Sequence, residues 1–197
     1  MPNNIKLIGV VGAGQMGLGI AQVFATSGFD VLINDNNKIT LSNSTEMINV
    51  NLEKAVNKGR LHKDVGVSSI KKIKTEFYIS ELGKCDLIIE AATENEKIKH
   101  EIFQNLIPHL KPHTILTSNT SSISITRLAA RTDRPEKFMG CHFMKPAPVM
   151  QLVELVRGIA TNEETTNCLK DLVKKIGKIS TNSEDFPAFI VNRILMP

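Results

Sequence analysis

Residues 8–17 read Ile8-Gly-Val-Val-Gly12-Ala-Gly14-Gln-Met-Gly17, and this stretch decides the fold class. Its glycines form a G-x-G-x-x-G motif between an apolar strand-like run and an apolar helix-like run. In such a unit the first glycine permits a tight turn, the second lets the backbone approach a pyrophosphate, and the third allows close helix–strand packing. The helix N-terminus offers free N–H groups to phosphate oxygens. We predict a dinucleotide-binding turn, the alternative being a glycine-rich turn without a ligand. The cofactor-binding residues expected in it are Gly12, Gly14, Gln15, Met16 and Gly17.

Strand-like and helix-like runs alternate along the rest of the chain. We expect strands at 5–11, 31–35, 86–91, 114–118, 138–143 and 152–156. We expect helices at 16–27, 40–58, 96–110, 123–131 and 163–176. This alternation predicts an α/β fold, a Rossmann-type doubly wound and mainly parallel sheet with flanking helices.

The length of 197 residues fits one domain and a fragment of another. Residues 1–184 form the predicted dinucleotide-binding domain. Residues 186–197 are typical of an apolar helix that begins at Pro187 and ends almost as soon as it starts. We interpret 185–197 as the opening of a second, all-α domain that is otherwise absent. We expect the apolar side chains of this helix to be exposed, namely Phe189, Ile190, Ile194 and Leu195.

The composition is that of an ordinary globular protein, with 42% apolar and 22% charged residues. No apolar run approaches the roughly 18 residues of a membrane helix. We expect no leader, because the first four residues carry no charged start or apolar stretch. Three widely spaced cysteines without a C-x-x-C pair are typical of reduced thiols. We expect a cytoplasmic protein that does not bind membranes.

The net charge of +4 is concentrated in one segment. Residues 38–75 hold eight basic and three acidic side chains, whereas the remaining chain holds 16 basic and 17 acidic ones. Aromatic residues do not alternate with this basic segment, which argues against nucleic acid. A small molecule that carries phosphate groups is the favoured partner.

Asp35 ends the second predicted strand, 18 residues after Gly17. A carboxylate at this point accepts hydrogen bonds from the adenosine ribose and repels a 2′-phosphate, so NAD is favoured over NADP. Lys38 is the one nearby cation that could favour NADP. The alternative is that Asp35 only serves as a turn or helix-cap residue.

His142 lies at the end of one predicted strand, and Glu154 lies within the next. A lone carboxylate in an apolar strand is costly to bury, and a His–Glu pair removes that cost. The carboxylate would accept one ring N–H of His142 and leave the other nitrogen free to act as a general base. A purely structural histidine is the alternative. Metal binding is not expected, because only Cys141 stands at ligand spacing.

Ser118-Asn-Thr-Ser-Ser122 follows the predicted strand 114–118. The carboxyl edge of an open α/β sheet is where ligands bind, so these side chains are candidates for the site. Serine and threonine are also good helix caps, and both interpretations stay open.

Several motifs occur in order over essentially all 197 residues. They are Gly12-Ala-Gly-Gln-Met-Gly17 with Gly19-Ile-Ala-Gln-Val-Phe-Ala25, Ser118-Asn-Thr-Ser-Ser122, His142-Phe143 with Pro146-Ala-Pro-Val-Met150, Leu152-Val-Glu-Leu-Val156, and Phe189-Ile-Val-Asn-Arg193. In these motifs the chain resembles L-3-hydroxyacyl-CoA dehydrogenases, above all the 3-hydroxybutyryl-CoA type.

The resemblance implies NAD-dependent oxidation of an L-3-hydroxyacyl-CoA, and the reverse reduction, in fatty-acid or butyrate metabolism. It implies that His142 is the general base and Glu154 its orienting partner, while Ser121 and Asn192 bind the substrate oxygens. The residues that it places at NAD, in addition to the turn, are Asp35, Glu94, Lys99 and Asn119. It places Asn51 and Lys58 near coenzyme A.

Two residues depart from the family pattern. Lys145 stands where the family has a neutral amide, beside the predicted base, and could depress the His142 pKa or bind an acidic group. Ala188 replaces a glycine, for which we expect little consequence. The family also continues into a helical domain with the dimer interface and part of the acyl pocket, so a homodimer is expected only if that domain is present. Two other functions stay open, a dehydrogenase of a free hydroxy acid and an NAD-binding module without turnover.

Overall fold

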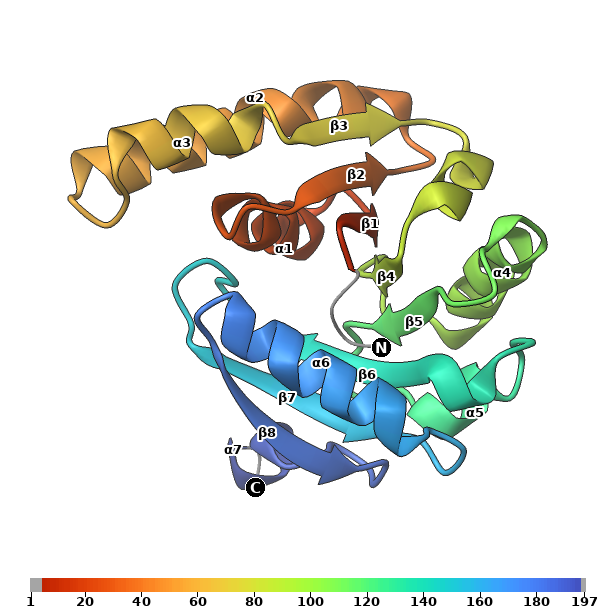
Figure 1. The fold of residues 1–197 in the computed structure, drawn as a ribbon. Helices are drawn as coiled ribbons and strands as arrows, with labels where there is room; N and C mark the ends of the chain where they lie inside the picture. The colour runs from red at the N-terminus through yellow and green to blue at the C-terminus, as the bar shows by residue number, and fades with distance from the viewer. Residues whose placement is uncertain (1–4, 196–197) are drawn as a thin grey trace.

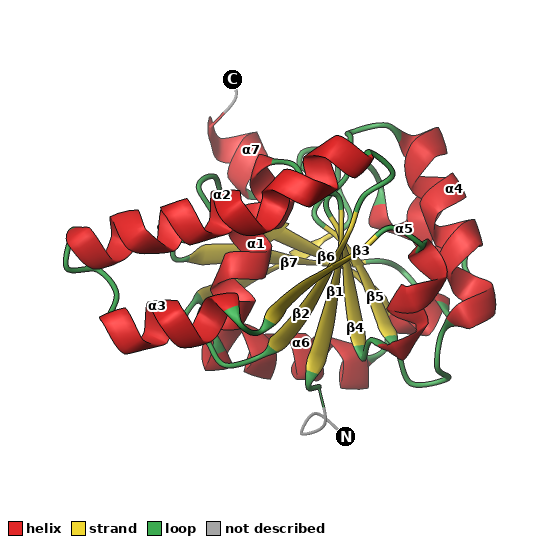
Figure 2. Cartoon of the chain, turned by 90° about the horizontal axis from the view of Figure 1, so that it is seen from above, coloured by secondary structure: helices red, strands yellow, loops and turns green. Residues whose placement is uncertain are grey.

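The computed structural model describes residues 5–195 and shows one twisted eight-stranded sheet with helices on both faces (Figure 1, Figure 2). The strand order is β3-β2-β1-β4-β5-β6-β7-β8. Neighbouring strands are parallel except β6 and β7, which are antiparallel. The order of the first six strands is that of the doubly wound dinucleotide-binding sheet, so the predicted Rossmann-type fold is confirmed.

The strands are β1 (Leu7–Val11), β2 (Asp30–Asn34), β3 (Ile73–Glu76), β4 (Leu87–Glu90), β5 (Ile115–Ser118), β6 (Phe138–Phe143), β7 (Leu152–Arg157) and β8 (Ile179–Glu184). The helices are α1 (Gln15–Thr26), α2 (Lys38–Asn57), α3 (Lys63–Ile70), α4 (Glu96–Leu106), α5 (Ile125–Ala129), α6 (Glu163–Lys175) and α7 (Val191–Leu195). Among the described residues, no helix is long and apolar enough to cross a membrane.

Each predicted strand and each of the five predicted helices before residue 185 is present, with ends that differ by a few residues. The largest difference is in the helix predicted at 96–110. There α4 ends at Leu106 and a 3₁₀ turn, Ile107–His109, follows it. Pro108 in that turn has no backbone N–H to continue the helix.

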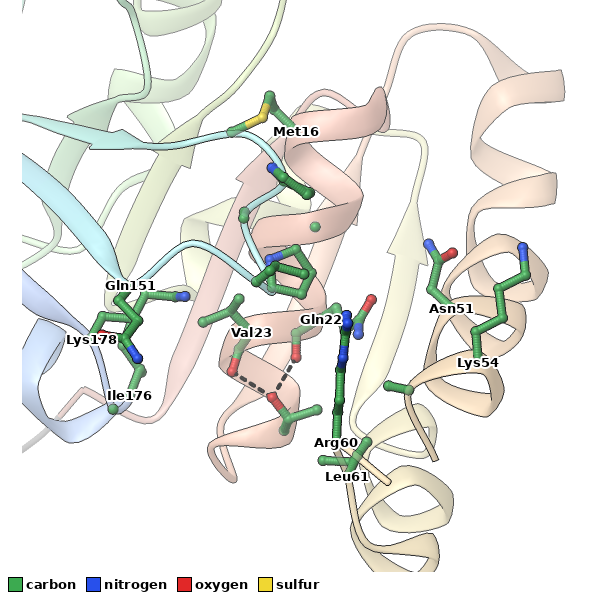
Figure 3. A pocket seen from close by; sticks show the side chains of 18 of the residues that line it. Met16, Gln22, Val23, Asn51, Lys54, Arg60, Leu61, Gln151, Ile176 and Lys178 are labelled. Carbon is green, nitrogen blue, oxygen red and sulfur yellow. Dashed lines mark hydrogen bonds between the residues drawn. The ribbon is translucent and has the colours of Figure 1, made fainter. Parts of the chain in front are cut away.

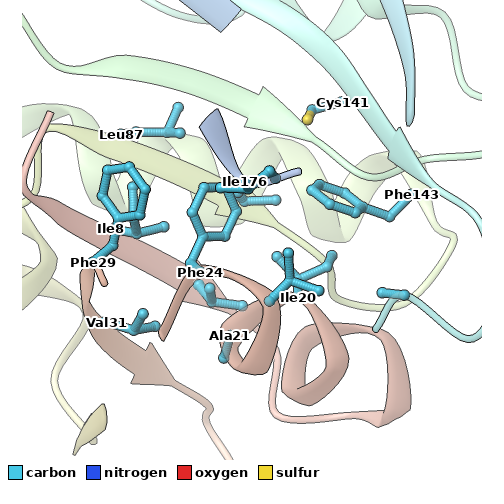
Figure 4. Close-up of a cluster of buried hydrophobic side chains, with 14 of the residues drawn as sticks. Ile8, Ile20, Ala21, Phe24, Phe29, Val31, Leu87, Cys141, Phe143 and Ile176 are labelled. Atoms are coloured by element: carbon cyan, nitrogen blue, oxygen red, sulfur yellow. The ribbon is translucent and has the colours of Figure 1, made fainter. Parts of the chain in front are cut away.

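The sheet separates two hydrophobic cores because successive side chains of a strand point to opposite faces. Ile8 and Val10 of β1 belong to one core, and Val11 belongs to the other. In the first core the Phe24 ring of α1 makes edge contacts with Phe29 and Phe143, at centroid distances of 5.7 and 6.2 Å (Figure 4). These contacts hold α1, and the turn that precedes it, against the sheet.

Two strands and one α-helix of the described residues were not predicted from the sequence, namely β3, β8 and α3. The two strands lie at the two edges of the sheet and are largely polar, with only Ile73 buried in β3 and only Ser183 in β8. Edge strands lack the apolar run by which a buried strand is recognised. Helix α3 buries only Gly66 and Ser69, so it also lacks an apolar stripe.

The segment after β8 differs from its prediction. The helix predicted from Pro187 begins at Val191, because Ala188 and Phe189 adopt φ values of 66° and 50°. The expected exposure is wrong for Phe189, which is 2% exposed and packs against the His142 ring, and for Ile190, which is half-buried. It is right for Ile194 and Leu195. The replacement of glycine by Ala188 also matters more than expected, since this left-handed backbone favours glycine. Residues 196–197 lie outside the described part of the chain.

Asp86 ties the start of β1 to the segment that leads into β4. Its Oδ2 accepts hydrogen bonds from the backbone N–H groups of Lys6 and Leu7, and its Oδ1 accepts one from Lys111 Nζ at 3.0 Å. Burial raises the pKa of Asp86, but these donors and the Lys111 charge outweigh it and lower the pKa to about 2.

We expect Asp86→Asn to lower the free energy of unfolding by about 2 kcal/mol at neutral pH. A depressed carboxyl pKa stabilises the fold above its unfolded value of about 4, and this stability is lost as the pH falls towards 2. The difference between variant and wild type should therefore shrink between pH 5 and pH 2 in urea titrations. Asp171→Asn, on the exposed side of α6, serves as the control. A difference that does not change with pH would contradict this role of Asp86.

Candidate active site

The glycine-rich turn between β1 and α1 has the backbone that the sequence predicts. Gly12 has φ +104°, and a Cβ there would lie 2.8 Å from the Ala91 carbonyl oxygen. A Cβ on Gly17 would collide with the carbonyl oxygen of Gly12. At Gly14 a Cβ would meet nothing within 4 Å, so this side of the turn is open to a ligand. Gly12 and Gly17 are therefore required because the protein backbone packs closely against them, whereas Gly14 faces open space that a ligand can occupy.

A groove of about 820 Å³ opens at this turn, at the carboxyl ends of β1, β2 and β4. The predicted cofactor residues that line it are Gly12, Gly14, Gln15, Met16 and Asp35. Asp35 accepts hydrogen bonds from Ala13 N–H at 2.7 Å and Asn37 N–H at 2.8 Å, so its carboxylate is held beside the turn. The open turn and this adjacent carboxylate fit the pyrophosphate and ribose of a dinucleotide.

Lys38 does not line this groove. Its ammonium lies 4.7 Å from the centroid of the Phe77 ring, a cation–π contact. Phe77 and Tyr78 themselves line the groove, and Tyr78 is 70% exposed. Lys38, the cation that could have favoured a 2′-phosphate, thus contacts the Phe77 ring at the side of the groove.

His142 and Glu154 face each other across the antiparallel strands β6 and β7, where the register pairs them directly. His142 Nδ1 lies 3.1 Å from Glu154 Oε2, and the two side chains are 7% and 0% exposed. The other ring nitrogen, Nε2, lies 3.0 Å from Ser121 Oγ. The predicted His–Glu pair is therefore present, and its second nitrogen meets the hydroxyl loop, residues 118–122.

Glu94 organises the hydroxyl loop. Its Oε1 accepts hydrogen bonds from four donors of that loop, namely Thr120 Oγ1, Ser121 N, Ser122 N and Ser122 Oγ. Burial raises the pKa of Glu94, but the hydrogen bonds and the charge of Lys99 outweigh it, so the pKa lies below its ordinary value. Glu94 thus stays charged and keeps Ser121 beside His142.

Glu90 is a site residue that the sequence analysis missed. It is fully buried at the end of β4 and accepts hydrogen bonds from Lys99 Nζ at 2.7 and 2.8 Å and from Ser118 Oγ at 2.6 Å. The signal was present, since a carboxylate in an apolar strand needs a partner here as it does at Glu154. Through Ser118, Glu90 thus ties the first residue of the hydroxyl loop to the end of β4.

Two of the predicted cofactor residues have protein partners in this region. Lys99 is 1% exposed, bound to Glu90 and 3.6 Å from Glu94 Oε2. Asn119 Oδ1 accepts a hydrogen bond from Phe143 N–H at 2.8 Å, which joins the hydroxyl loop to β6. Contacts of Glu94, Lys99 and Asn119 with a cofactor stay predictions.

Asn192 joins the same cluster from the far end of the chain. Its Nδ2 donates to the Ser121 carbonyl oxygen at 2.9 Å. Glu154 Oε1 accepts hydrogen bonds from Ile190 N–H and Val191 N–H, immediately before Asn192. The structure thus brings His142, Glu154, Ser121 and Asn192 together, although they are spread over 72 residues.

A second pocket of about 550 Å³ lies between α1, α2 and the segment after β6 (Figure 3). Asn51 and Lys58 both line it, together with Lys54, Arg60 and Lys178. Burial lowers the pKa of Lys178, whose Nζ donates to the Met150 carbonyl oxygen at 2.6 Å. Gln15 and Met16 line both this basic pocket and the dinucleotide groove, so the two hollows meet at the start of α1.

Lys145 lies just beyond β6, where it is exposed and precedes Pro146 in a cis peptide. Within residues 5–195, no group of three or more histidine, cysteine or acidic side chains is placed to hold a metal ion.

Comparison with known proteins identifies the family. Residues 7–186 match the model of the 3-hydroxyacyl-CoA dehydrogenase NAD-binding domain, which confirms NAD as the cofactor predicted from Asp35. A 3-hydroxybutyryl-CoA dehydrogenase of Bradyrhizobium diazoefficiens is 52% identical over 98% of this chain and 66% of its own length. The human mitochondrial hydroxyacyl-coenzyme A dehydrogenase is 38% identical over 98% of this chain and 63% of its own length.

Solved structures agree with the sequence matches. The (S)-3-hydroxybutyryl-CoA dehydrogenase from Ralstonia eutropha superposes with a TM-score of 0.94 at 39% identity, covering 98% of this chain and 68% of that one. The chain thus spans about two thirds of the length of these relatives. The sheet order, the glycine-rich turn and the His142–Glu154 pair agree with these matches. This chain belongs to the 3-hydroxyacyl-CoA dehydrogenase family, as the matches over nearly all of its residues show.

Proposed function

We propose that this protein transfers hydride reversibly between carbon 3 of an L-3-hydroxyacyl-CoA and NAD, forming the 3-oxoacyl-CoA. The observation that carries the proposal is the His142 ring, held between the Glu154 carboxylate and the Ser121 hydroxyl. It lies at the carboxyl end of β6, which is parallel to β5, and hence at the sheet edge where the dinucleotide groove opens. The name of the Bradyrhizobium relative supports a short-chain ester of the 3-hydroxybutyryl type.

His142 is the proposed general base. The buried Glu154 carboxylate accepts a hydrogen bond from Nδ1–H, which fixes the tautomer and leaves Nε2 as the basic nitrogen. Nε2 then takes the proton of the substrate hydroxyl as the C3–H bond breaks, and returns it in the reductive direction. General acid–base catalysis of this kind contributes about 10²–10⁴-fold. NAD, when bound, supplies the acceptor of the hydride.

Ser121 and Asn192 are the proposed ligands of the substrate oxygens. The Ser121 hydroxyl is 3.0 Å from His142 Nε2, so an oxygen that replaces or joins it there is within reach of the base. One N–H of the Asn192 amide is bound to the Ser121 carbonyl, and within residues 5–195 the second N–H has no acceptor, so it can donate to a substrate. Together they would orient the hydroxyl and stabilise the carbonyl oxygen.

The basic pocket is the proposed site of the coenzyme A portion. Lys54, Lys58, Arg60 and Lys178 supply cations for phosphate groups, and Asn51 supplies an amide. The pocket meets the dinucleotide groove at Gln15 and Met16, so an ester bound in it would lie next to the dinucleotide.

The wider setting of the chain is also part of this proposal. Residues 185–195 would lead into a helical domain that completes the acyl pocket and forms a dimer, which the exposed Ile194 and Leu195 support. The three cysteines are free and buried, which supports a reducing, cytoplasmic environment.

An assay of NAD reduction with 3-hydroxybutyryl-CoA and with free 3-hydroxybutyrate tests the proposal. In a form that carries the helical domain we expect turnover of the ester and little or none of the acid, because only the ester can use the basic pocket. The 197-residue chain alone should turn over the ester poorly or not at all, since its acyl pocket is incomplete. The exposed Lys145, three residues after His142, is the observation that favours a free hydroxy acid. Preference for the acid would support that alternative, and NAD binding without hydride transfer would support a binding module.

We expect His142→Gln to lower kcat by two or more orders of magnitude, because the base is lost. NAD affinity should stay within a few-fold of the wild-type value, since His142 does not line the dinucleotide groove. Steady-state kinetics and fluorescence titration with NADH measure the two effects. His62→Gln, an exposed histidine before α3, is the matched control. A variant that keeps more than a tenth of the wild-type rate would remove His142 from this role.

We expect Asp35→Ala to weaken NAD binding by about 10- to 100-fold, the value of a hydrogen bond to a charged acceptor. The preference for NAD over NADP should narrow as well, because the charge that repels a 2′-phosphate disappears. Dissociation constants for both cofactors give the answer. Asp30→Ala, at the opposite end of the same strand, is the control. If the affinities for NAD and for NADP both stay at their wild-type values, the assignment of Asp35 is wrong.

A further inference from the structure

Asp185 binds the start of α5, which lies about 60 positions earlier in the chain. Its Oδ2 accepts hydrogen bonds from Ser124 Oγ at 2.6 Å and Thr126 N–H at 2.8 Å. Its Oδ1 accepts one from Ile125 N–H at 2.9 Å. Both carboxylate oxygens are therefore used to fix the end of β8 to the residues that follow the hydroxyl loop.

The segment after Asp185 has a second anchor at Glu154. We call residues 185–191 the strap. Ile190 N–H and Val191 N–H donate to Glu154 Oε1 at 2.7 and 3.1 Å. Between the anchors, Phe189 is 2% exposed and lies against the His142 ring, with centroids 6.2 Å apart. The strap is thus held at one carboxylate near each end.

The backbone of the strap needs these anchors. Ala188 and Phe189 both have positive φ values, 66° and 50°. Residues other than glycine keep such a backbone only where the surrounding structure holds it. If the Asp185 anchor were removed, the strap would relax towards an ordinary backbone, and the positions of Ile190 and Val191 would change with it.

The strap delivers Asn192 to the active site. Asn192 Nδ2 donates to the Ser121 carbonyl oxygen, and Ser121 Oγ lies 3.0 Å from His142 Nε2. The hydroxyl loop is held by Glu94 at Ser121 and Ser122, and its continuation is held by Asp185 at Ser124. Asp185 therefore connects both segments that meet at the substrate oxygens.

We propose that Asp185 is a positioning residue of the dehydrogenase, which acts through Asn192 and Ser121 by fixing the strap to the hydroxyl loop. The expected effect on kcat rests on the function proposed above, because it presupposes dehydrogenase activity. Its structural part, the anchoring of the strap, stands on the hydrogen bonds alone. Asp185 itself touches neither reacting group and contributes no proton.

The test compares Asp185→Ala and Asp185→Asn with the wild-type chain. We expect the alanine variant to lower kcat for 3-hydroxybutyryl-CoA at least tenfold, while KM for NAD stays within twofold, because the dinucleotide groove does not include the strap. The asparagine variant keeps one acceptor oxygen at the same distance and should recover part of kcat. Hydrogen exchange of the Ile190 and Val191 amides, measured by NMR, should become at least tenfold faster in the alanine variant.

Asn162→Ala is the matched control, because Asn162 caps α6 by accepting from Thr165 N–H at 2.7 Å, away from the site. It should lower Tm as a lost helix cap does, without a change in kcat. If Asp185→Ala lowers kcat no more than Asn162→Ala does, Asp185 is only a cap and the proposal is overturned. The kinetic comparison uses a form that carries the helical domain. If that form has no activity, the proposed function fails, and amide exchange still decides the anchor. Faster exchange then supports it, and unchanged exchange overturns it.

Discussion

The candidate active site depends on one buried carboxylate that is shared between two segments. Glu154 is fully buried, with Oε2 beside His142 Nδ1 and Oε1 accepting from Ile190 and Val191. A buried carboxylate without such partners costs several kcal/mol, so the surrounding structure must supply them. Because the two oxygens face different segments, satisfying Glu154 also fixes the proposed base relative to the strap that carries Asn192. The reversal of strand direction at β6 and β7 makes this possible, since it pairs His142 with Glu154 directly.

The parallel part of the sheet uses acidic residues in a related way. Glu90 ends β4 and is neutralised by Lys99 from α4, while Glu94, in the loop that precedes α4, gathers the N–H and hydroxyl groups of the hydroxyl loop. Asp185 does the same for the start of α5. Charged acceptors make stronger hydrogen bonds than neutral ones. Loops at the carboxyl edge, which lack the regular hydrogen bonding of a strand, are thereby held in place.

The dinucleotide groove and the basic pocket meet, so one domain could bring NAD and the proposed coenzyme A ester together. The dinucleotide groove and the basic pocket share Gln15 and Met16, the first two residues of α1. Packing of Phe24 against Phe29 and Phe143 holds α1 on the sheet, so this shared boundary has a fixed place. The glycine-rich turn and the residues that the two cavities share are therefore held on the sheet together with α1.

The sequence by itself determined the features that rest on local patterns. The glycine-rich turn, six strands and five helices follow from apolar periodicity and from the backbone freedom of glycine. The pairing of His142 with Glu154 follows from the cost of burying a lone carboxylate, and the same argument applied to Glu90 would have found its partner. Polar edge strands such as β8 bury little, so no apolar pattern revealed them.

Only the tertiary structure decided the contacts that join distant segments. The burial of Phe189, the left-handed backbone at Ala188, and the binding of Asp185 to α5 have no signature in the neighbouring sequence. Each depends on where the chain stands after β8, the last strand added to the sheet. Hydrogen bonds between residues some 60 positions apart form only once the sheet has brought these residues together. A local sequence pattern does not show which distant residue will become a neighbour in the fold.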